Sequence, residues 1–492
     1  MMNSFYSWYW SNYSPEVAVC PVLKVLPTEI GILVFRVVHG KRERTSMWRG
    51  TTRPSELVRP NPNLVRFVPG RIGRGLTDDL DTVAGDMVRN HVAVMQNFPA
   101  LWYERRRDDH ARTRRANADV WAPFYEQPFS RSGQGEAYDR LSKYDLTKWN
   151  TWYWLRLKKF ADLADQNGLV FLEEHYLQHN IIEEGAHWAD YPWRTANNIN
   201  NPGFPENPAF SGDKRVFMAE QFYDTTNLVI RNYHRNYIRK SLDNFADNAN
   251  IIHHLGSEFT GPLHFVEFWL NVIREWETEN NKKVLVMLPG TKEVQDAILA
   301  DPKFSSLVDM IDVIQWQYRS DGSLYAPIGG VSLTERQYSR LEEVGETSFG
   351  QIYRAVSEFR TKYPGKAIVY SRRGVKFADW AVFMGGGSLA SLPTVPDARF
   401  LVQASEMKSM PRNNTSSKQY VLGKEGLGYI IYSESQNVTV DLTSDKKSYL
   451  LKWINPSTGE TLNSEVKVAG GKLNTINSPF QGPVVAWITG KF

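Results

Sequence analysis

The stretch IIHHLGSEFTGP, residues 251–262, places a short apolar run before a turn of small residues, a single carboxylate and a Gly-Pro pair. The segment LHFVEFWLNVIREWE, residues 263–277, follows with apolar residues at helical spacing. This order predicts a strand, a loop and a helix, with Glu258 just beyond the carboxyl end of the strand. Because α/β barrels carry their catalytic groups at that end of the strands, Glu258 is the first candidate for catalysis.

A regular rhythm of short apolar runs and amphipathic segments starts at residue 63. Eight alternations in one domain favour a closed (β/α)8 TIM barrel over an open doubly wound sheet, and no glycine-rich dinucleotide loop follows the first run. The count makes residues 251–255 strand four, and the longest insertions follow strands two and three. We expect strands at residues 63–69, 92–95, 169–172, 251–255, 283–288, 310–315, 366–370 and 380–383, and a closing helix at residues 398–408.

The pattern changes at residue 419 to short strands at close spacing, separated by turn signals such as NPSTG at residues 455–459. That pattern is typical of a small antiparallel β-sandwich. We therefore expect an α/β chain of three parts: an N-terminal extension (1–62), a (β/α)8 catalytic barrel (63–410) and a C-terminal β-sandwich (411–492).

The composition narrows the class of substrate. The 492 residues carry a net charge of +4 from 58 basic and 54 acidic side chains, which is too balanced to indicate nucleic-acid binding. Aromatic residues make up 13% of the chain, with 16 Trp and 23 Tyr. Aromatic faces stack on the C–H faces of sugar rings, so this content favours a carbohydrate substrate, although large cores and anchored loops would also use aromatic residues.

The cysteine count and the hydropathy pattern argue against disulfides, cysteine-based metal sites and membrane spans. Cys20 is the only cysteine, so no intrachain disulfide and no cysteine-based metal site is possible, and we expect no cofactor. No run of about 18 apolar residues is present, so no membrane span is predicted. No signal peptide is visible in the chain.

Glycoside hydrolysis needs two carboxyl groups, one as the acid that protonates the leaving oxygen and one as base or nucleophile. Glu258 is well placed to be the acid, and its alternative role is to cap the helix that follows. In the large clan of retaining barrel glycosidases with a strand-four acid, the nucleophile is a glutamate after strand seven. Here strand seven reads KAIVYSRRG, with Ser371 and Arg372 at that position. The mechanism of that clan therefore does not carry over directly.

The partner carboxylate has to come from another loop on the same face. Glu173 and Glu174 follow strand three, and Asp321 lies in WQYRSDGS after strand six. Consecutive strand residues point to opposite sides, so only one of the two glutamates faces the barrel mouth. We favour Glu174, with Asp321 as the alternative, while Glu220 and Asp224 in AEQFYD are further candidates.

Aromatic, basic and histidine side chains on the same loops are candidates for binding the substrate. The histidines after strand three match no tight zinc spacing, so we expect substrate hydrogen bonds there and no metal. His253 and His254 lie inside a predicted buried strand and are more typical of a core. An arginine pairs with a sugar carboxylate in bidentate fashion, which would suit a uronate. The expected substrate-binding residues are Trp102, Tyr103, Arg105, His175, His179, Trp193, Trp316, Tyr318 and Arg372.

Several stretches together carry a resemblance that covers residues 63–492. They are DVWAPFYEQPFSRSGQGEAYDRLSKYDLTKWNTWYW, GAHWADYPWRTANNINNPGFPE, SEFTGPLHF, WQYRSDGSLYAPIGG, KWINPSTGE and SPFQGPVVAWI. With them the chain resembles the bacterial (β/α)8 glycoside hydrolases that carry a small C-terminal β-sandwich, relatives of the apiosidase-type enzymes whose sandwich is often labelled a collagen-binding domain. It looks like a distinct branch of that group. The resemblance implies polysaccharide breakdown by exported bacterial enzymes and a catalytic role for Glu258.

The expected function is thus hydrolysis of a glycosidic bond in a complex polysaccharide or oligosaccharide, with acidic sugars among the candidates. The absence of a strand-seven glutamate favours inversion of the anomeric centre. It also keeps two alternatives open. One is a carbohydrate-binding protein on a degenerate barrel, and the other is a polysaccharide lyase that uses Tyr, His or Arg on an acidic sugar.

Overall fold

The computed structural model describes the backbone of short strands at residues 26–28, 31–33, 36–38 and 47–49. It further describes residues 80–89, 94–97, 99, 127–178, 181, 188–204, 219–256, 259–329, 345–370, 375–397, 399–410 and 418–490.

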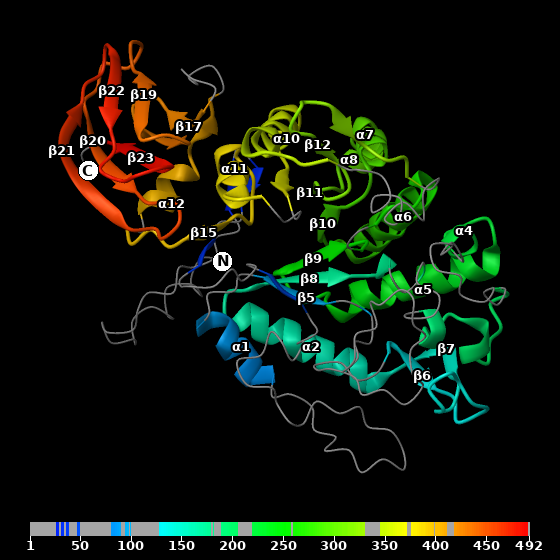
Figure 1. The fold of residues 1–492 in the computed structure, drawn as a ribbon. Helices are drawn as coiled ribbons and strands as arrows, with labels where there is room; N and C mark the ends of the chain where they lie inside the picture. The colour runs from blue at the N-terminus through cyan, green and yellow to red at the C-terminus, as the bar shows by residue number, and fades with distance from the viewer. Residues whose placement is uncertain are drawn as a thin grey trace.

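A curled parallel sheet with helices around it forms the larger part of the molecule (Figure 1). In the described part of the chain its strands follow one another in chain order, β4-β5-β8-β9-β10-β11-β14, and every neighbouring pair is parallel. Ser388 bridges Val369 in parallel beyond β14, at the place of an eighth strand. The strands are β4 (Met47–Arg49), β5 (Val94–Asn97), β8 (Val170–Glu174), β9 (Ile251–His254), β10 (Leu285–Leu288), β11 (Met310–Asp312) and β14 (Ala367–Val369).

Helices connect these strands, which makes the unit a (β/α)8 barrel fold. Asparagine or serine caps several of them: Asn227 Oδ1 accepts from the amides of Val229 and Ile230, and Ser348 Oγ accepts from that of Gln351. The helices are α1 (Leu80–Arg89), α2 (Thr151–Gln166), α4 (Ala219–Phe222), α5 (Leu228–Asn244), α6 (Leu263–Asn280), α7 (Lys292–Ala300), α8 (Pro302–Ser305), α10 (Phe349–Lys362), α11 (Ala378–Met384) and α12 (Arg399–Ala404), with 3-10 turns η2 (Trp188–Asp190) and η3 (Thr195–Asn197).

Short two-stranded ladders lie in the loops of the barrel. The hairpin of β6 and β7 lies in the segment that links β5 to α2, and the hairpin of β12 and β13 follows β11. Near the amino end, β1 pairs with β2, and β3 pairs in parallel with β15. The bounds are β1 (Leu26–Thr28), β2 (Gly31–Leu33), β3 (Arg36–Val38), β6 (Phe129–Arg131), β7 (Tyr144–Trp149), β12 (Gln317–Tyr318), β13 (Leu324–Tyr325) and β15 (Ser391–Pro393).

The structure corrects two details of the strand count. Residues 380–383, expected as strand eight, belong to helix α11, and the bridge at Ser388 takes that place. A short buried apolar run such as WAVF fits a strand and a buried helix equally well by periodicity. At the other end, β4 pairs with β5, so the barrel sheet begins inside the segment that we expected to precede it. The expected strand at residues 63–69 lies outside the described residues.

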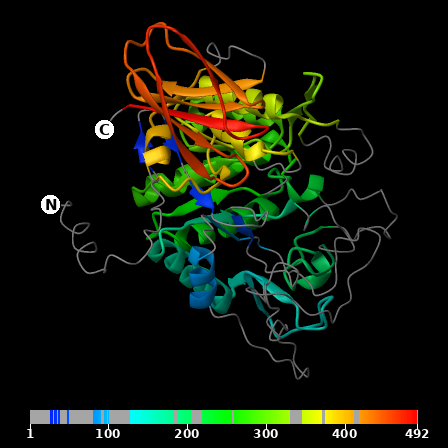
Figure 2. The ribbon, with the colours of Figure 1, turned by 60° about the vertical axis from the view of Figure 1, so that its left-hand side comes forward.

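The C-terminal part is an antiparallel β-sandwich with its own buried core (Figure 2). One sheet has the order β16-β17-β18-β23-β20-β21, and β19 pairs with β22 in a second ladder. The bounds are β16 (Lys408–Ser409), β17 (Gln419–Lys424), β18 (Gly428–Ser433), β19 (Asn437–Asp441), β20 (Tyr449–Ile454), β21 (Thr461–Val468), β22 (Leu473–Asn477) and β23 (Val484–Thr489). Figure 2 shows this sandwich seated against the barrel on the side of α10, α11 and α12.

Aromatic side chains hold the sandwich on the barrel. The ring of Phe349 at the start of α10 stacks on Tyr432 of β18, with centroids 4.2 Å apart. Trp380 Nε1 of α11 donates to the carbonyl oxygen of Pro456, 2.8 Å away in the β20–β21 turn. In the same turn Gly459 has φ +77°, and a Cβ there would lie 2.0 Å from the carbonyl oxygen of Thr394. The turn therefore fits the barrel only with glycine at position 459.

We predict that Gly459→Ala lowers the unfolding free energy much more than Gly471→Ala. Gly471 has a similar φ of +75° but has nothing within 4 Å of an added Cβ, so its substitution costs only the backbone strain, about 1–2 kcal/mol. At Gly459 the same strain is joined by a clash with backbone of the barrel. Denaturant unfolding of both variants measures the difference, and equal losses would contradict the close approach.

Candidate active site

The inner surface of the barrel changes from apolar to polar at the carboxyl ends of four strands. Its inner core holds apolar residues such as Val170 and Leu172 of β8 and Ile252 of β9. Side chains alternate between the faces of a sheet, so the next inward position lies two residues further on. In β5, β8, β9 and β11 that position carries the buried residues Gln96, Glu174, His254 and Asp312.

Glu174 lies at the centre of this polar layer. Gln96 Nε2 donates a hydrogen bond to Glu174 Oε1, and His254 Nδ1 lies 3.9 Å from the same oxygen. Among the described residues, no group hydrogen-bonds to either ring nitrogen of the buried His254. A buried polar atom left unpaired costs about 1–3 kcal/mol. This corner of the barrel is therefore suited to a polar group of a ligand.

Glu173 points the other way, into the layer between the sheet and its helices. Asn97 Nδ2 donates to Glu173 Oε2 at 2.9 Å, and Ser241 Oγ donates to Oε1 at 3.4 Å. Complete burial raises the pKa of Glu173 to about 8, with the neighbouring Glu174 adding to the rise. At neutral pH Glu173 is therefore mostly a neutral carboxylic acid behind the sheet, and Glu174 is the glutamate on the inner face.

His175 and His253 also lie behind the sheet. Trp269 Nε1 donates to His175 Nδ1 at 2.9 Å, so the proton of His175 is on Nε2, which lies 3.1 Å from His253 Nδ1. Burial lowers the pKa of both rings, that of His253 to about 3. The expectation that His175 contacts substrate is thus corrected: its ring is fully buried and both nitrogens are used within the core.

Three aromatic residues expected to stack on sugar are packed in the protein interior instead. Trp193 stacks on the ring of His234 with centroids 4.7 Å apart. Trp316 is fully buried and donates through Nε1 to Gln295 Oε1 at 2.9 Å. Tyr318 is 6% exposed, and the guanidinium carbon of Arg354 lies 3.7 Å from its ring centroid. These rings serve packing, because their faces are already covered by protein.

Asp321 occupies the exposed turn between β12 and β13. Its Oδ1 accepts hydrogen bonds from the amide and the hydroxyl of Ser323, at 2.9 and 2.7 Å. These bonds lower the pKa of Asp321 and explain why an aspartate sits there: it holds the turn. The barrel strand before this hairpin, β11, supplies the inward carboxylate of this region, Asp312.

The remaining expected site residues, Glu258, Trp102, Tyr103, Arg105, His179 and Arg372, lie outside the described residues, and their roles stay predictions. The residues on either side of the Ser257-Glu258 pair are firmly anchored. A Cβ on Gly256 would lie 2.4 Å from the carbonyl oxygen of Tyr176, so only glycine fits at position 256. After the pair, Phe259 is buried, and Thr260 Oγ1 accepts from Gln178 Nε2 at 3.1 Å.

Sequence reasoning missed three members of the polar layer, namely Gln96, His254 and Asp312. The signal was present in the strands VMQN, IIHH and MID, each of which ends an apolar run with a polar residue at an inward position. Within the described residues, no three His, Cys, Asp or Glu side chains gather as metal ligands would. No helix in the described part of the chain is long and apolar enough to cross a membrane.

We predict that Glu173→Gln removes a pH dependence of stability. The pKa of Glu173 is raised from 4.5 to about 8 in the folded state, so between these values the folded protein binds more protons than the unfolded chain. Its contribution is complete below pH 4.5 and falls by about 1.4 kcal/mol per pH unit up to about pH 8. Denaturant unfolding across this range should show a shallower fall for Glu173→Gln, whereas Glu425→Gln, at an exposed position, should follow the parent protein. Identical pH profiles for Glu173→Gln and parent would contradict the assignment.

Comparisons with known proteins place the chain in a family. No curated protein matches it. Among solved structures, it is similar to one titled glycoside hydrolase (10% identity, 84% of this chain and 88% of that chain, TM-score 0.45). It is also similar to a family 5 glycoside hydrolase from Bacteroides vulgatus ATCC 8482 (10%, 83% and 85%, 0.43) and a GH30 endoxylanase from Clostridium papyrosolvens C71 (13%, 84% and 92%, 0.33).

One family model covers most of the chain. It matches residues 19–407, a range that contains all the barrel strands and stops before the sandwich core. The description of that family is "Domain of unknown function (DUF6298)", and the chain belongs to it.

Proposed function

We propose that the protein is a glycoside hydrolase that cleaves glycosidic bonds in a complex polysaccharide. The observation that carries this proposal is Glu174, an inward carboxylate at the carboxyl end of the third barrel strand, beside the unpaired ring of His254. Barrel enzymes bind substrate at this end of the strands. A carboxylate there has the chemistry required to activate water or to attack an anomeric carbon.

In the proposed mechanism Glu258 is the general acid. It follows strand β9 by four residues, and β9 is the hydrogen-bonded neighbour of β8, which carries Glu174. Glu258 would protonate the leaving oxygen, while Glu174 would take the proton of the attacking water. The hydrogen bond from Gln96 holds the carboxylate of Glu174 in position for that task. Asp312, the other described inward carboxylate, is the second candidate for the base.

The substrate class follows from the same chemistry. The proposed enzyme requires no cofactor, because two carboxyl groups and water suffice for the reaction. Complex polysaccharides are found outside cells, so we infer that the enzyme works after export. Arg105 and Arg372 stay candidates for binding an acidic sugar.

We predict that Glu258→Gln and Glu174→Gln each lower hydrolysis about 10²- to 10⁴-fold, because each removes a proton-transfer group. A panel of plant and algal glycans, with products separated by chromatography, first identifies a substrate for the parent protein. Asp321→Asn is the matched control: it changes an exposed turn carboxylate and should keep activity. Full activity of Glu258→Gln would refute the assignment of Glu258 as the general acid. Full activity of Glu174→Gln would refute Glu174 as the base and leave Asp312 as the candidate for that role.

We further predict inversion of the anomeric centre. Strand seven lacks the glutamate that serves as nucleophile in retaining barrel enzymes, so Glu174 is assigned as a base acting through water. Proton NMR of the first product formed shows the anomer directly. Retention would instead require a carboxylate about 5–5.5 Å from the acid rather than about 6.5–9.5 Å.

A binding protein without catalysis is the second candidate. The complete burial of Glu174 and its bond to Gln96 favour it, since a structural carboxylate has the same surroundings. Calorimetry would then show glycan binding with no product released. A lyase would be recognised by an unsaturated product that absorbs ultraviolet light.

A further inference from the structure

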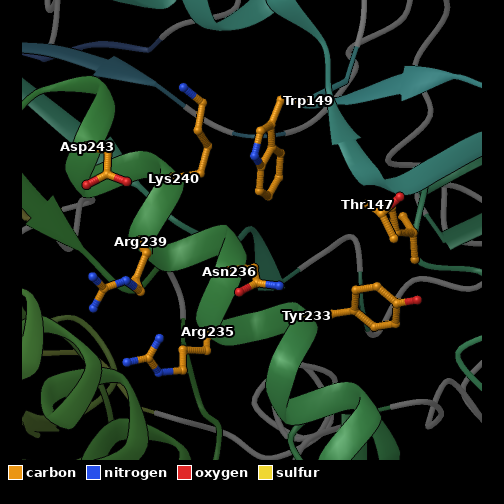
Figure 3. Close-up of a pocket in the computed structure, with 9 residues that line it drawn as sticks. Thr147, Trp149, Tyr233, Arg235, Asn236, Arg239, Lys240 and Asp243 are labelled. Carbon is orange, nitrogen blue, oxygen red and sulfur yellow. The ribbon is translucent and has the colours of Figure 1, made fainter.

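A hollow lies on the flank of the barrel, between β7 and helix α5. It has a volume of about 320 Å³, at the lower end of the range of small-ligand sites. The end of β7 forms one wall, with Leu146, Thr147 and Trp149, and the outer surface of α5 forms the other (Figure 3). The hollow is thus built by two elements that carry none of the proposed catalytic residues.

Helix α5 presents two rows of side chains to this hollow. Residues three, four and seven positions apart share a helix face, so Tyr233, Asn236 and Lys240 form one row. Arg235 and Arg239 form the adjoining row, and Figure 3 shows them pointing away from Trp149. That second row belongs to the contact with α6.

Ion pairs and hydrogen bonds occupy the α6 side of the hollow. Arg235 Nη2 lies 2.8 Å from Glu275 Oε2, and Arg239 Nη2 pairs with Glu279 Oε2. Asp243 accepts a hydrogen bond from Trp276 Nε1 at 2.6 Å. The charges of Arg235 and Arg239 are thus balanced within the protein, so a ligand would gain little from them.

The β7 side differs, because it combines an aromatic ring with Lys240, a cation that attracts the Asp243 carboxylate on the same helix without forming an ion pair with it. Phe129 stacks beside Trp149 with centroids 5.4 Å apart, and Figure 3 shows Trp149 next to Lys240 and Asn236. Within the described part of the chain no carboxylate forms an ion pair with Lys240, whose Nζ lies 5.1 Å from the ring of Trp154. Partial burial lowers the pKa of Lys240, as expected for a cation short of water.

We propose that this hollow is a second carbohydrate-binding site, which takes an acidic sugar with its ring against Trp149 and its carboxylate toward Lys240. The indole offers an apolar face to the C–H groups of the ring. Lys240 offers a charge-assisted hydrogen bond to the carboxylate. The amide of Asn236 and the hydroxyl of Tyr233 stand within the same hollow to bind ring hydroxyls. The inference rests on the proposed function only in taking carbohydrate as the ligand.

Calorimetric titration of the full chain with trigalacturonate and triglucuronate tests the site. Neutral trisaccharides of the same length serve as comparison probes, and all proteins carry Glu174→Gln so that the probe is not consumed. We expect Lys240→Met to abolish uronide binding at this site or to lower its affinity about tenfold or more, because the variant loses a charge-assisted hydrogen bond. Binding of neutral sugars should change little.

Two further variants complete the experiment. Trp149→Ala should weaken all sugars at this site, and an unchanged unfolding midpoint shows that the loss does not come from misfolding. Lys158→Met is the matched control, since it removes a lysine that is paired with Asp162 on the neighbouring helix, and it should bind like the parent. No uronide binding, or equal uronide affinity of Lys240→Met and parent, overturns the proposal.

The two proposals fail in different ways. Binding that depends on Lys240 without any hydrolysis by the protein with intact Glu174 would refute only the proposed function. Hydrolysis with no effect of Lys240→Met on uronide affinity would refute only the second site.

Discussion

The alternation of side chains along β8 and β9 is the constraint on which the rest of the structure depends. The register pairs Glu173 with His253 and Glu174 with His254. Since neighbouring residues point to opposite faces, one pair enters the barrel and the other enters the helical layer. A shift by one residue would exchange the two pairs and bury the wrong carboxylate behind the sheet. Strand register therefore decides which side chains form the polar layer, and the contacts among those side chains follow from it.

The helical layer fixes that register with polar groups of its own. Asn97 of β5 and Ser241 of α5 both bind the neutral Glu173, and Trp269 of α6 binds His175. Each of these bonds joins a strand to a helix or to another strand. These bonds are buried, so they favour one packing of the helices over its neighbours. The inner face can then carry an unpaired histidine without loss of the fold.

Much of this architecture could be predicted from the sequence. The alternation of strands and helices gives the barrel, and two-residue periodicity limits the inward glutamate to one of Glu173 and Glu174, of which we favoured Glu174. The aromatic content was a weaker guide, because nine tryptophans of the described residues are at most 3% exposed, among them Trp188, Trp193 and Trp316. A tryptophan in a loop and one in a core have the same local sequence pattern. Only tertiary packing distinguishes them, as it does for the helix at residues 378–384 that resembles a strand.

Contacts between distant segments explain the other differences. Asp312 ends the three-residue strand MID, whose pattern identifies an inward carboxylate only once the facing of the neighbouring strands is known. Asp321, in contrast, is an aspartate because its side chain holds an exposed turn. The hollow beside α5 combines residues far apart in the chain, such as Trp149 and Lys240, which are 91 positions apart. No local pattern marks such a pair.

The aromatic contact between barrel and sandwich also limits how the chain can be shortened. Phe349 and Tyr353 on α10 pack on Tyr420 and Tyr432. The first two residues precede the junction at residues 411–417 in the sequence, and the other two follow it. A chain that stopped before this junction would expose the two rings of α10 to water as one apolar patch. Patches of that kind promote aggregation. The sandwich therefore keeps this apolar part of the barrel surface out of water.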